Sequence, residues 1–274
     1  MHAADLQPSP LPLQQRVALV TGVSRRSGIG YAIARRLFAW GASVFLHHYL
    51  PHDLEQPWGA DAGGIDAVLQ GVRDVQTLAS AQLAHASADL RDPLAPAQLL
   101  ETALAHYGHL DILVCNHARS GADAGLSGLS AAMLDEHWAV NTRATLLLVQ
   151  AYAAQHDGRP GGRVIMLTSG QGLGPMPNEL AYAASKGALA AVTLSLADEL
   201  AERGITVNTV NPGPVDTGYA SNDVRQAVAK HFPRGRWGQP DDPARLIAWL
   251  ASDDAAWITG QVLHSEGGFR RWAP

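Results

Sequence analysis

Short apolar runs alternate with longer stretches of helical pattern along the whole chain. The apolar runs are mostly continuous, which is typical of strands buried on both faces of a sheet. The expected strands are Val17–Thr21, Ser43–His47, Ile112–Cys115, Val164–Thr168, Thr206–Val210 and Gln261–His264. The stretches of helix length between them are Ile29–Trp40, Pro96–Tyr107, Ala131–Ala153, Tyr182–Arg203 and Asp242–Ala251.

This alternation predicts an α/β fold, a doubly wound parallel sheet of about seven strands with helices on both faces. The 274 residues would allow one or two domains, but no linker is wide enough to divide them. We therefore expect a single domain over residues 13–274, after a disordered proline-rich lead-in at residues 1–12. Two segments break the alternation, His48–Gly64 and Gly218–Gln239, and we interpret both as loops or lids.

Composition excludes several classes of function. The 20 Lys and Arg against 25 Asp and Glu give a net charge of −5, which argues against a nucleic-acid binder. No apolar stretch approaches about 18 residues, so we expect no membrane span, and the first residues do not read as a signal peptide. The single cysteine, Cys115, excludes a disulfide framework and fits a cytoplasmic location.

The first expected strand ends in a glycine cluster, TGVSRRSGIG, with a helix directly after it. In that context Gly22, Gly28 and Gly30 would let the backbone approach a pyrophosphate at the helix N-terminus. An ordinary glycine-rich turn is the alternative. The spacing also differs from G-x-G-x-x-G.

A tyrosine and a lysine lie four residues apart, at Tyr182 and Lys186, on one face of an expected helix. Ser169 lies thirteen residues before Tyr182, at the end of a buried strand. A nearby ammonium favours the phenolate, so this pair could make a general acid/base. Alone, a Y-x-x-x-K pattern is weak evidence, because helix-surface pairs are common.

Together, the glycine cluster and this trio resemble the short-chain dehydrogenase/reductase family, from about Arg16 to Phe269. Within the family, the chain is most similar to bacterial β-ketoacyl-carrier-protein-reductase-like members. The resemblance implies a Rossmann-like single domain. The matching positions, in chain order, are Thr21-Gly22, Gly28-Ile29-Gly30, Asp89-Leu90, Cys115-Asn116-His117-Ala118, Asn141, Ser169, Tyr182, Lys186, Asn211 to Thr217, Gly260-Gln261-Val262 and Gly267-Gly268.

The resemblance also implies four catalytic roles. Tyr182 would be the general acid/base and Ser169 would hydrogen-bond the substrate oxygen. Lys186 would hold the ribose of a nicotinamide cofactor and lower the pKa of Tyr182. Asn141 would position a water that links Lys186 to solvent.

The implied cofactor is NADP(H), with NAD(H) as the alternative. The phosphate loop holds two more residues than the family loop, and Arg25 or Arg26 is suited to grip a 2′-phosphate. No acid follows the second strand before Asp53, so a 2′-phosphate would not be repelled there. The expected cofactor-binding residues are Thr21, Gly22, Ser24, Arg25, Arg26, Gly28, Ile29, Gly30, His48, Asp89, Leu90, Asn116, Tyr182, Lys186, Pro212, Gly213, Val215 and Thr217.

The substrate pocket is expected around His117, Gln171, Met176 and Tyr219, with Gly218–Gln239 as its lid. His117 replaces a smaller family residue and would either face the substrate or fill a gap. Cys115 is interpreted as a packed strand-end residue. His47, His48 and His52 lie close together, but their spacing matches no defined metal site, so no metal is expected.

The predicted function is NAD(P)-dependent hydride transfer between a nicotinamide and a carbonyl or secondary alcohol, with a 3-oxoacyl thioester or related ketone as a candidate substrate. Two alternatives stay open: a cofactor-binding sensor or assembly subunit without turnover, and an epimerase or dehydratase on the same scaffold. The resemblance implies a homotetramer or dimer whose partner is a small molecule.

Overall fold

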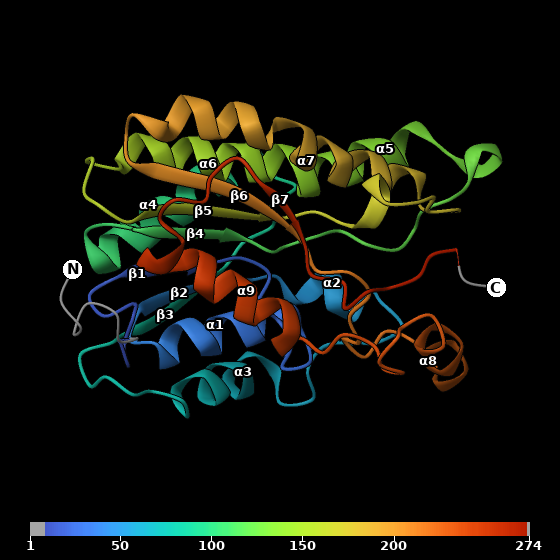
Figure 1. Ribbon diagram of the computed structural model, residues 1–274, viewed down its shortest axis with the longest axis horizontal. Helices are drawn as coiled ribbons and strands as arrows, with labels where there is room; N and C mark the ends of the chain where they lie inside the picture. The colour runs from blue at the N-terminus through green and yellow to red at the C-terminus, as the bar shows by residue number, and fades with distance from the viewer. Residues whose placement is uncertain (1–8, 273–274) are drawn as a thin grey trace.

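Seven parallel strands form one twisted sheet between two layers of helices (Figure 1). The computed structural model describes residues 9–272, and its strand order is β3-β2-β1-β4-β5-β6-β7. The strands are β1 (Val17–Val20), β2 (Ser43–His48), β3 (Leu83–Ser87), β4 (Ile112–Cys115), β5 (Gly162–Leu167), β6 (Ile205–Asn211) and β7 (Val262–His264). The predicted α/β doubly wound fold is confirmed.

The two helical layers bury two separate hydrophobic cores. Helices α1, α3 and α9 cover one face of the sheet, and α4, α6 and α7 cover the other (Figure 1). In β1, Ala18 and Val20 belong to the first core while Leu19 faces the second, because successive strand residues point to opposite faces. The helices are α1 (Ile29–Ala39), α2 (Leu50–Leu54), α3 (Gly64–Arg73), α4 (Ala95–Tyr107), α5 (Ala131–His137), α6 (Ala144–Gln155), α7 (Leu180–Ala201), α8 (Asn222–Ala229) and α9 (Asp241–Ala251).

Several elements differ from the expectation. The single helix expected over Ala131–Ala153 is divided into α5 and α6 by a π-helical segment, Trp138–Arg143. Strand β3 was not among the expected runs because it is a half-buried edge strand, LAHAS, without a continuous apolar pattern. The segment His48–Gly64 contains the short helix α2, which was not expected, whereas α8 is the short helical stretch expected within Gly218–Gln239.

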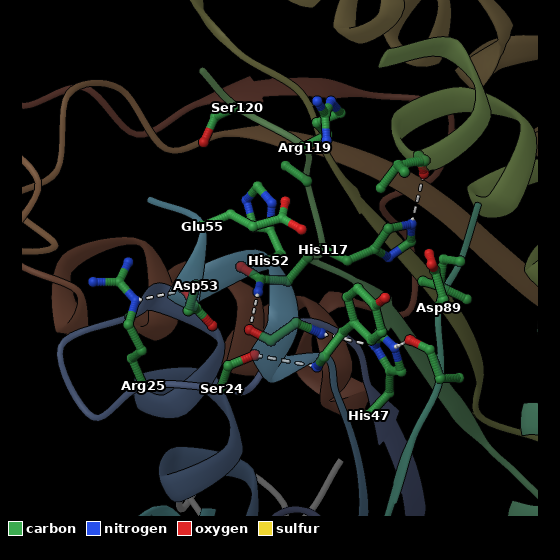
Figure 2. Close-up of a pocket in the computed structure, with 18 of the residues that line it drawn as sticks. Ser24, Arg25, His47, His52, Asp53, Glu55, Asp89, His117, Arg119 and Ser120 are labelled. Carbon is green, nitrogen blue, oxygen red and sulfur yellow. Dashed lines mark hydrogen bonds and ion pairs between the residues drawn. The ribbon is translucent and has the colours of Figure 1, made fainter. Parts of the chain in front are cut away.

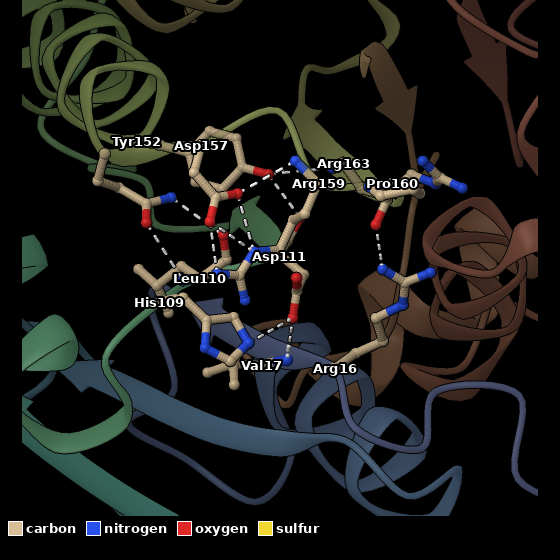
Figure 3. A network of polar contacts seen from close by, with 11 residues as sticks. Arg16, Val17, His109, Leu110, Asp111, Tyr152, Asp157, Arg159, Pro160 and Arg163 are labelled. Carbon is tan, nitrogen blue, oxygen red and sulfur yellow. Dashed lines mark hydrogen bonds and ion pairs between the residues drawn. The ribbon is translucent and has the colours of Figure 1, made fainter. Parts of the chain in front are cut away.

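A polar network fastens the amino ends of the central strands (Figure 3). The buried Asp111 carboxylate accepts a hydrogen bond from the backbone N–H of Val17 at 2.8 Å and lies 3.3 Å from His109 Nε2. The Tyr152 hydroxyl donates to the Asp111 carbonyl and accepts from the N–H of Arg163. These bonds join β1, β4 and β5 at the amino ends of the strands. The polar residues of the site lie at the opposite, carboxyl ends.

Residues 1–8 of the expected lead-in lie outside the described residues. Leu13, directly after it, is 1% exposed and its N–H donates to the carbonyl of Trp40. Within residues 9–272, α7 is the one helix long and apolar enough, by length and composition, to cross a membrane. It packs on β6 and carries residues of the second core, and a core helix passes the same test.

Candidate active site

The site begins at the topological switch point, where neighbouring strands β1 and β4 lead to helices on opposite faces. Gly22 follows β1 with φ +73°, and a Cβ there would lie 2.7 Å from the Cα of His117. A Cβ on Gly30 would lie 2.5 Å from the carbonyl oxygen of Gly22. Backbone packing therefore requires glycine at both positions, and the left-handed backbone of Gly22 requires it there a second time.

Helix α1 begins directly at this turn with its N-terminal N–H groups uncapped. Its N-cap is Gly28, no side chain caps it, and its first turn contains no acid. Such an end is a ready anion site, because several N–H donors and the helix dipole face the same point. The residues at the switch point therefore fit a pyrophosphate group.

Hydrogen bonds of Thr21 and Asn116 stabilise the turn at Gly22. The Thr21 hydroxyl accepts from the N–H of Asn116 at 3.0 Å and donates to Nδ1 of His117 at 2.7 Å. The Asn116 side chain donates to the carbonyls of Thr21 and Gly22, both at 3.0 Å. Thr21 is fully buried, so it supports the turn.

A pocket opens above the turn, between the carboxyl ends of β1, β2, β3 and β4 (Figure 2). Ten predicted site residues line it: Gly22, Ser24, Arg25, Gly28, Ile29, Asp89, Leu90, Asn116, His117 and Thr217. Thr21, Arg26, Gly30 and His48 do not, nor do Pro212, Gly213 and Val215. The pocket also stops short of Ser169, Tyr182 and Lys186.

The two arginines of the phosphate loop have different partners. Arg25 lines the pocket, where its Nε lies 3.0 Å from Asp53 Oδ1 and its Nη1 donates to the Thr217 carbonyl. Arg26 instead turns to Asp61, whose carboxylate accepts from its Nε and Nη2. The Arg26 guanidinium is therefore held outside the lining of the pocket, and its predicted contact with the cofactor stays a prediction.

The segment after β2 folds back over the pocket; we call residues 49–63 the strap. It contributes His52, Asp53, Glu55 and Trp58 to the pocket wall. The Trp58 ring centroid lies 5.4 Å from the Arg25 guanidinium carbon, and Trp58 Nε1 donates to Asp53. The sequence contains the two arginines and the two aspartates, but their spacing does not show that Arg25 pairs with Asp53 and Arg26 with Asp61.

At the end of β2, His47 rather than His48 faces the site. His47 Nδ1 accepts from the N–H of Gly22 at 3.2 Å, and its Nε2 donates to the Ala88 carbonyl at 2.9 Å. Burial lowers the pKa of His47 to about 4, so the ring is neutral. His48 points to the other face of the sheet, 3.1 Å from His85, because side chains alternate along a strand. His47, and not the predicted His48, therefore lines the pocket.

Ser169 and Tyr182 come together where β5 ends and α7 begins, and Lys186 lies one turn further along α7. Lys186 is 2% exposed; its Nζ donates to the Leu167 carbonyl at 2.8 Å and lies 6.0 Å from the Tyr182 ring centroid. Burial lowers the pKa of Lys186 to about 8. These three residues form the predicted cluster.

The pKa of Tyr182 shifts opposite to the expectation. Burial, with the charge of Glu179 adding to it, raises this pKa to about 12, and the neighbouring Ser169 hydroxyl offsets only part of the rise. Desolvation of the phenolate is the largest cause of this rise, and Lys186 is not among the groups that shift the pKa. The raised pKa favours the protonated phenol of Tyr182.

Asn141 lies in the π-helical segment and is fully buried. Its Oδ1 accepts from the N–H of Arg119, and its Nδ2 donates to the Arg119 carbonyl and the Ser185 hydroxyl. Since both amide hydrogens have protein partners, the side chain joins the strand-end loop to α7. The expected role of Asn141, to position a water that links Lys186 to solvent, stays a prediction.

The predicted substrate residues are spread around the mouth of the site. Tyr219 packs edge-on against Trp58 and lies 5.9 Å from the Trp237 ring, so the strap meets the Gly218–Gln239 segment through aromatic contacts. Gln171 donates to the Thr168 hydroxyl, Met176 is half-buried, and His117 is 6% exposed with Nε2 on the Val140 carbonyl. His117 therefore lines the pocket with both ring nitrogens bonded to protein groups.

The loop after β6 is held by the end of the chain. Gly213 has φ +67°, its N–H donates to Asn211 Oδ1, and a Cβ there would lie 2.8 Å from the Cα of Glu266. Asn211 in turn donates to Glu266, which pairs with Arg271. Within the part of the chain that the structure describes, no three His, Cys, Asp or Glu side chains gather as metal ligands.

Comparison with known proteins agrees with this architecture. A family model described as enoyl-(acyl carrier protein) reductase matches residues 22–270. The chain is 44% identical to the uncharacterized oxidoreductase YjdA of Bacillus subtilis over 94% of this chain and 98% of that protein. It is 35% identical to the 3-oxoacyl-[acyl-carrier-protein] reductase FabG of Escherichia coli over 92% of this chain and 96% of that protein.

Solved structures agree as well. A short-chain dehydrogenase/reductase from Serratia marcescens is 35% identical, covers 94% of this chain and 99% of its own, and superposes with a TM-score of 0.80. The fold and site are those of an oxidoreductase with a Rossmann-like domain. The chain belongs to the short-chain dehydrogenase/reductase family and is similar to its ketoreductase members.

Proposed function

We propose that the protein is an NADP(H)-preferring carbonyl reductase or secondary-alcohol dehydrogenase, with a 3-oxoacyl thioester or related ketone as a candidate substrate. The observation that carries this proposal is the cluster of Ser169, Tyr182 and Lys186 beside the pocket. A bound nicotinamide cofactor would supply the hydride chemistry.

Each residue of the cluster has a role that its contacts support. Tyr182 donates its phenol proton to the carbonyl oxygen, and Ser169 hydrogen-bonds the same oxygen and orients it. One N–H of the Lys186 ammonium donates to the Leu167 carbonyl. The other two N–H groups would bind the cofactor ribose and return a proton to Tyr182. Asn141 keeps the π-helical segment against α7.

The preference for NADP(H) rests on charge. Arg25 lines the pocket, and β2 ends in histidines and a tyrosine rather than an acid. The strap does bring the Asp53 carboxylate into the pocket, but this charge is paired with Arg25. We assign Arg25, and not Arg26, to the 2′-phosphate.

The oligomeric state and location follow the family in this proposal: a homotetramer or dimer in the cytoplasm, acting on a small molecule. Alanine-rich α7, with α5 and α6 from the expected helix Ala131–Ala153, supplies small and apolar positions for a two-fold contact. Size-exclusion chromatography with light scattering tests this.

Tyr182→Phe tests the proposed chemistry. This variant keeps the ring and removes the proton donor, so NADPH-dependent reduction of ketones, quinones and β-ketoacyl thioesters should fall by about a thousandfold or more. NADPH affinity, measured by fluorescence, should stay within about twofold of wild type. Turnover retained in Tyr182→Phe would refute the role, and wild-type protein that binds NADPH but oxidises it with no substrate would favour a sensor.

A further inference from the structure

One buried carboxylate next to Tyr182 has no place in the proposed chemistry. Asp123 lies on the loop between β4 and α5, and its side chain is 5% exposed. It accepts hydrogen bonds from the backbone N–H of Tyr182 at 2.7 Å and of Ala181 at 3.1 Å. A third bond comes from the N–H of Ala124 at 2.7 Å.

The two α7 bonds satisfy groups that the helix cannot satisfy itself. Ala181 and Tyr182 stand in the first turn of α7, where N–H groups have no acceptor within the helix. The N-cap residue Glu179 makes no side-chain capping bond. Asp123 therefore caps the helix from another segment, and its negative charge lies where the helix dipole stabilises it.

The surroundings keep Asp123 charged and in place. Burial raises the pKa of Asp123, the N–H groups of Tyr182, Ala124 and Ala181 lower it, and the net shift is downward. His137 of α5, fully buried, lies beside it: its Nε2 is 4.0 Å from Asp123 Oδ2, and its ring meets the Tyr182 ring edge-on at 6.4 Å. Asp123 and His137 thus confine the start of α7 from two elements.

We propose that Asp123 is a positioning residue for the acid/base tyrosine: by capping the first turn of α7, it fixes the phenol of Tyr182 against Ser169. The argument rests on the proposed function, since it assigns Asp123 to the same reaction. A frayed first turn would move the phenol relative to Lys186, which lies a full turn deeper in the helix. Misplacement of this kind reduces turnover more than cofactor binding.

Hydrogen exchange tests the cap without any substrate. In Asp123→Ala, the amides of Ala181 and Tyr182 should exchange roughly tenfold faster than in wild type. Asp123→Asn should lie between the two, because its amide accepts one N–H but opposes the other with its own donors. Ser130→Ala is the matched control. It removes the N-cap of α5, where the Ser130 hydroxyl accepts from the N–H of Met133, and should speed exchange only at the Met133 amide.

Steady-state kinetics with NADPH and a ketone then test the consequence. In Asp123→Ala, kcat should fall by about ten- to a hundredfold with the NADPH Kd within about twofold. Asp123→Asn should recover part of the loss, and Ser130→Ala should match wild type.

Each failure has a separate meaning. Unchanged exchange at Ala181 and Tyr182 would overturn the cap itself. Faster exchange with undiminished kcat would overturn the positioning role. If wild-type protein reduces no carbonyl, the proposed function fails while the exchange result still decides the cap. If Asp123→Ala does not fold, Asp123→Asn provides both readouts.

Discussion

The carboxylate of Asp61 binds both the guanidinium and the backbone N–H of Arg26. One carboxylate oxygen accepts from the backbone N–H of Arg26 at 2.9 Å, and the carboxylate also accepts from Nε and from Nη2, the latter at 2.7 Å. Arg25, the neighbour of Arg26, pairs with Asp53 inside the pocket. The two arginines of the phosphate loop thus fasten the strap at two points, and only Arg25 lines the pocket.

This difference predicts unequal effects of two alanine substitutions. Arg25→Ala should weaken NADPH binding by about tenfold or more relative to NADH, because a charge-assisted hydrogen bond is lost. Arg26→Ala should leave both affinities within about twofold, since Arg26 lies outside the pocket. Fluorescence titration with each cofactor measures both.

Two other outcomes would be informative. Equal weakening of NADPH and NADH in Arg25→Ala would place this arginine on the shared pyrophosphate and remove it from cofactor choice. A selective loss of NADPH in Arg26→Ala would contradict the geometry of its pair with Asp61.

Gly22 provides a second prediction, because it combines a left-handed backbone with a backbone contact. Gly22→Ala would place a Cβ 2.7 Å from the Cα of His117, so the turn must shift, and NADPH binding should fall by at least about tenfold. Gly108 is the matched control: its φ is +77°, and a Cβ there meets open space. Gly108→Ala should cost only the backbone strain, about 1–2 kcal/mol, and leave NADPH affinity unchanged.

Urea unfolding and NADPH titration of both variants provide the measurements. If Gly22→Ala behaves like Gly108→Ala in both, the contact between the turn and His117 does not limit the site.

The order of strands and helices could be predicted from the sequence because the same alternation recurs along the chain. Short continuous apolar runs such as Ile112–Cys115 are typical of buried strands of a covered sheet, and their alternation with helices along the chain predicts a doubly wound fold. The glycine turn could also be predicted, since Gly22 permits a left-handed backbone and Gly30 permits a close backbone contact that other residues would block. The half-buried strand β3 carries no such signature.

What the sequence could not predict depends on contacts between distant residues. The pairs Arg25–Asp53 and Arg26–Asp61 cross from one loop to another, so no local spacing records them. The direction of the Tyr182 pKa depends on how deeply the phenol is buried, and a sequence gives burial only as a pattern. Asp123 escaped notice because a lone aspartate in a polar loop resembles any other until the helix that it caps lies against it.

His47 provides the last prediction, on pH. The folded state holds this ring neutral, with a pKa of about 4, because burial lowers it from an unfolded value near 6.5. Between these values the unfolded chain binds a proton at His47 that the folded chain does not, so stability falls as pH decreases from about 6.5 towards about 4. Over that range the contribution is about 3 kcal/mol, at about 1.4 kcal/mol per pKa unit.

His47→Gln should therefore flatten the acid side of the stability profile, measured by urea unfolding at intervals from pH 4 to pH 7. The NADPH Kd should also become less sensitive to acid, because a protonated Nδ1 can no longer accept from Gly22 and the phosphate turn loses that bond. His106→Gln, which changes an exposed ring on α4, is the control and should keep the wild-type slope. If the free energy of unfolding of His47→Gln depends on pH as steeply as that of wild type, His47 is not the source of the acid sensitivity. Other buried imidazoles would then be its source.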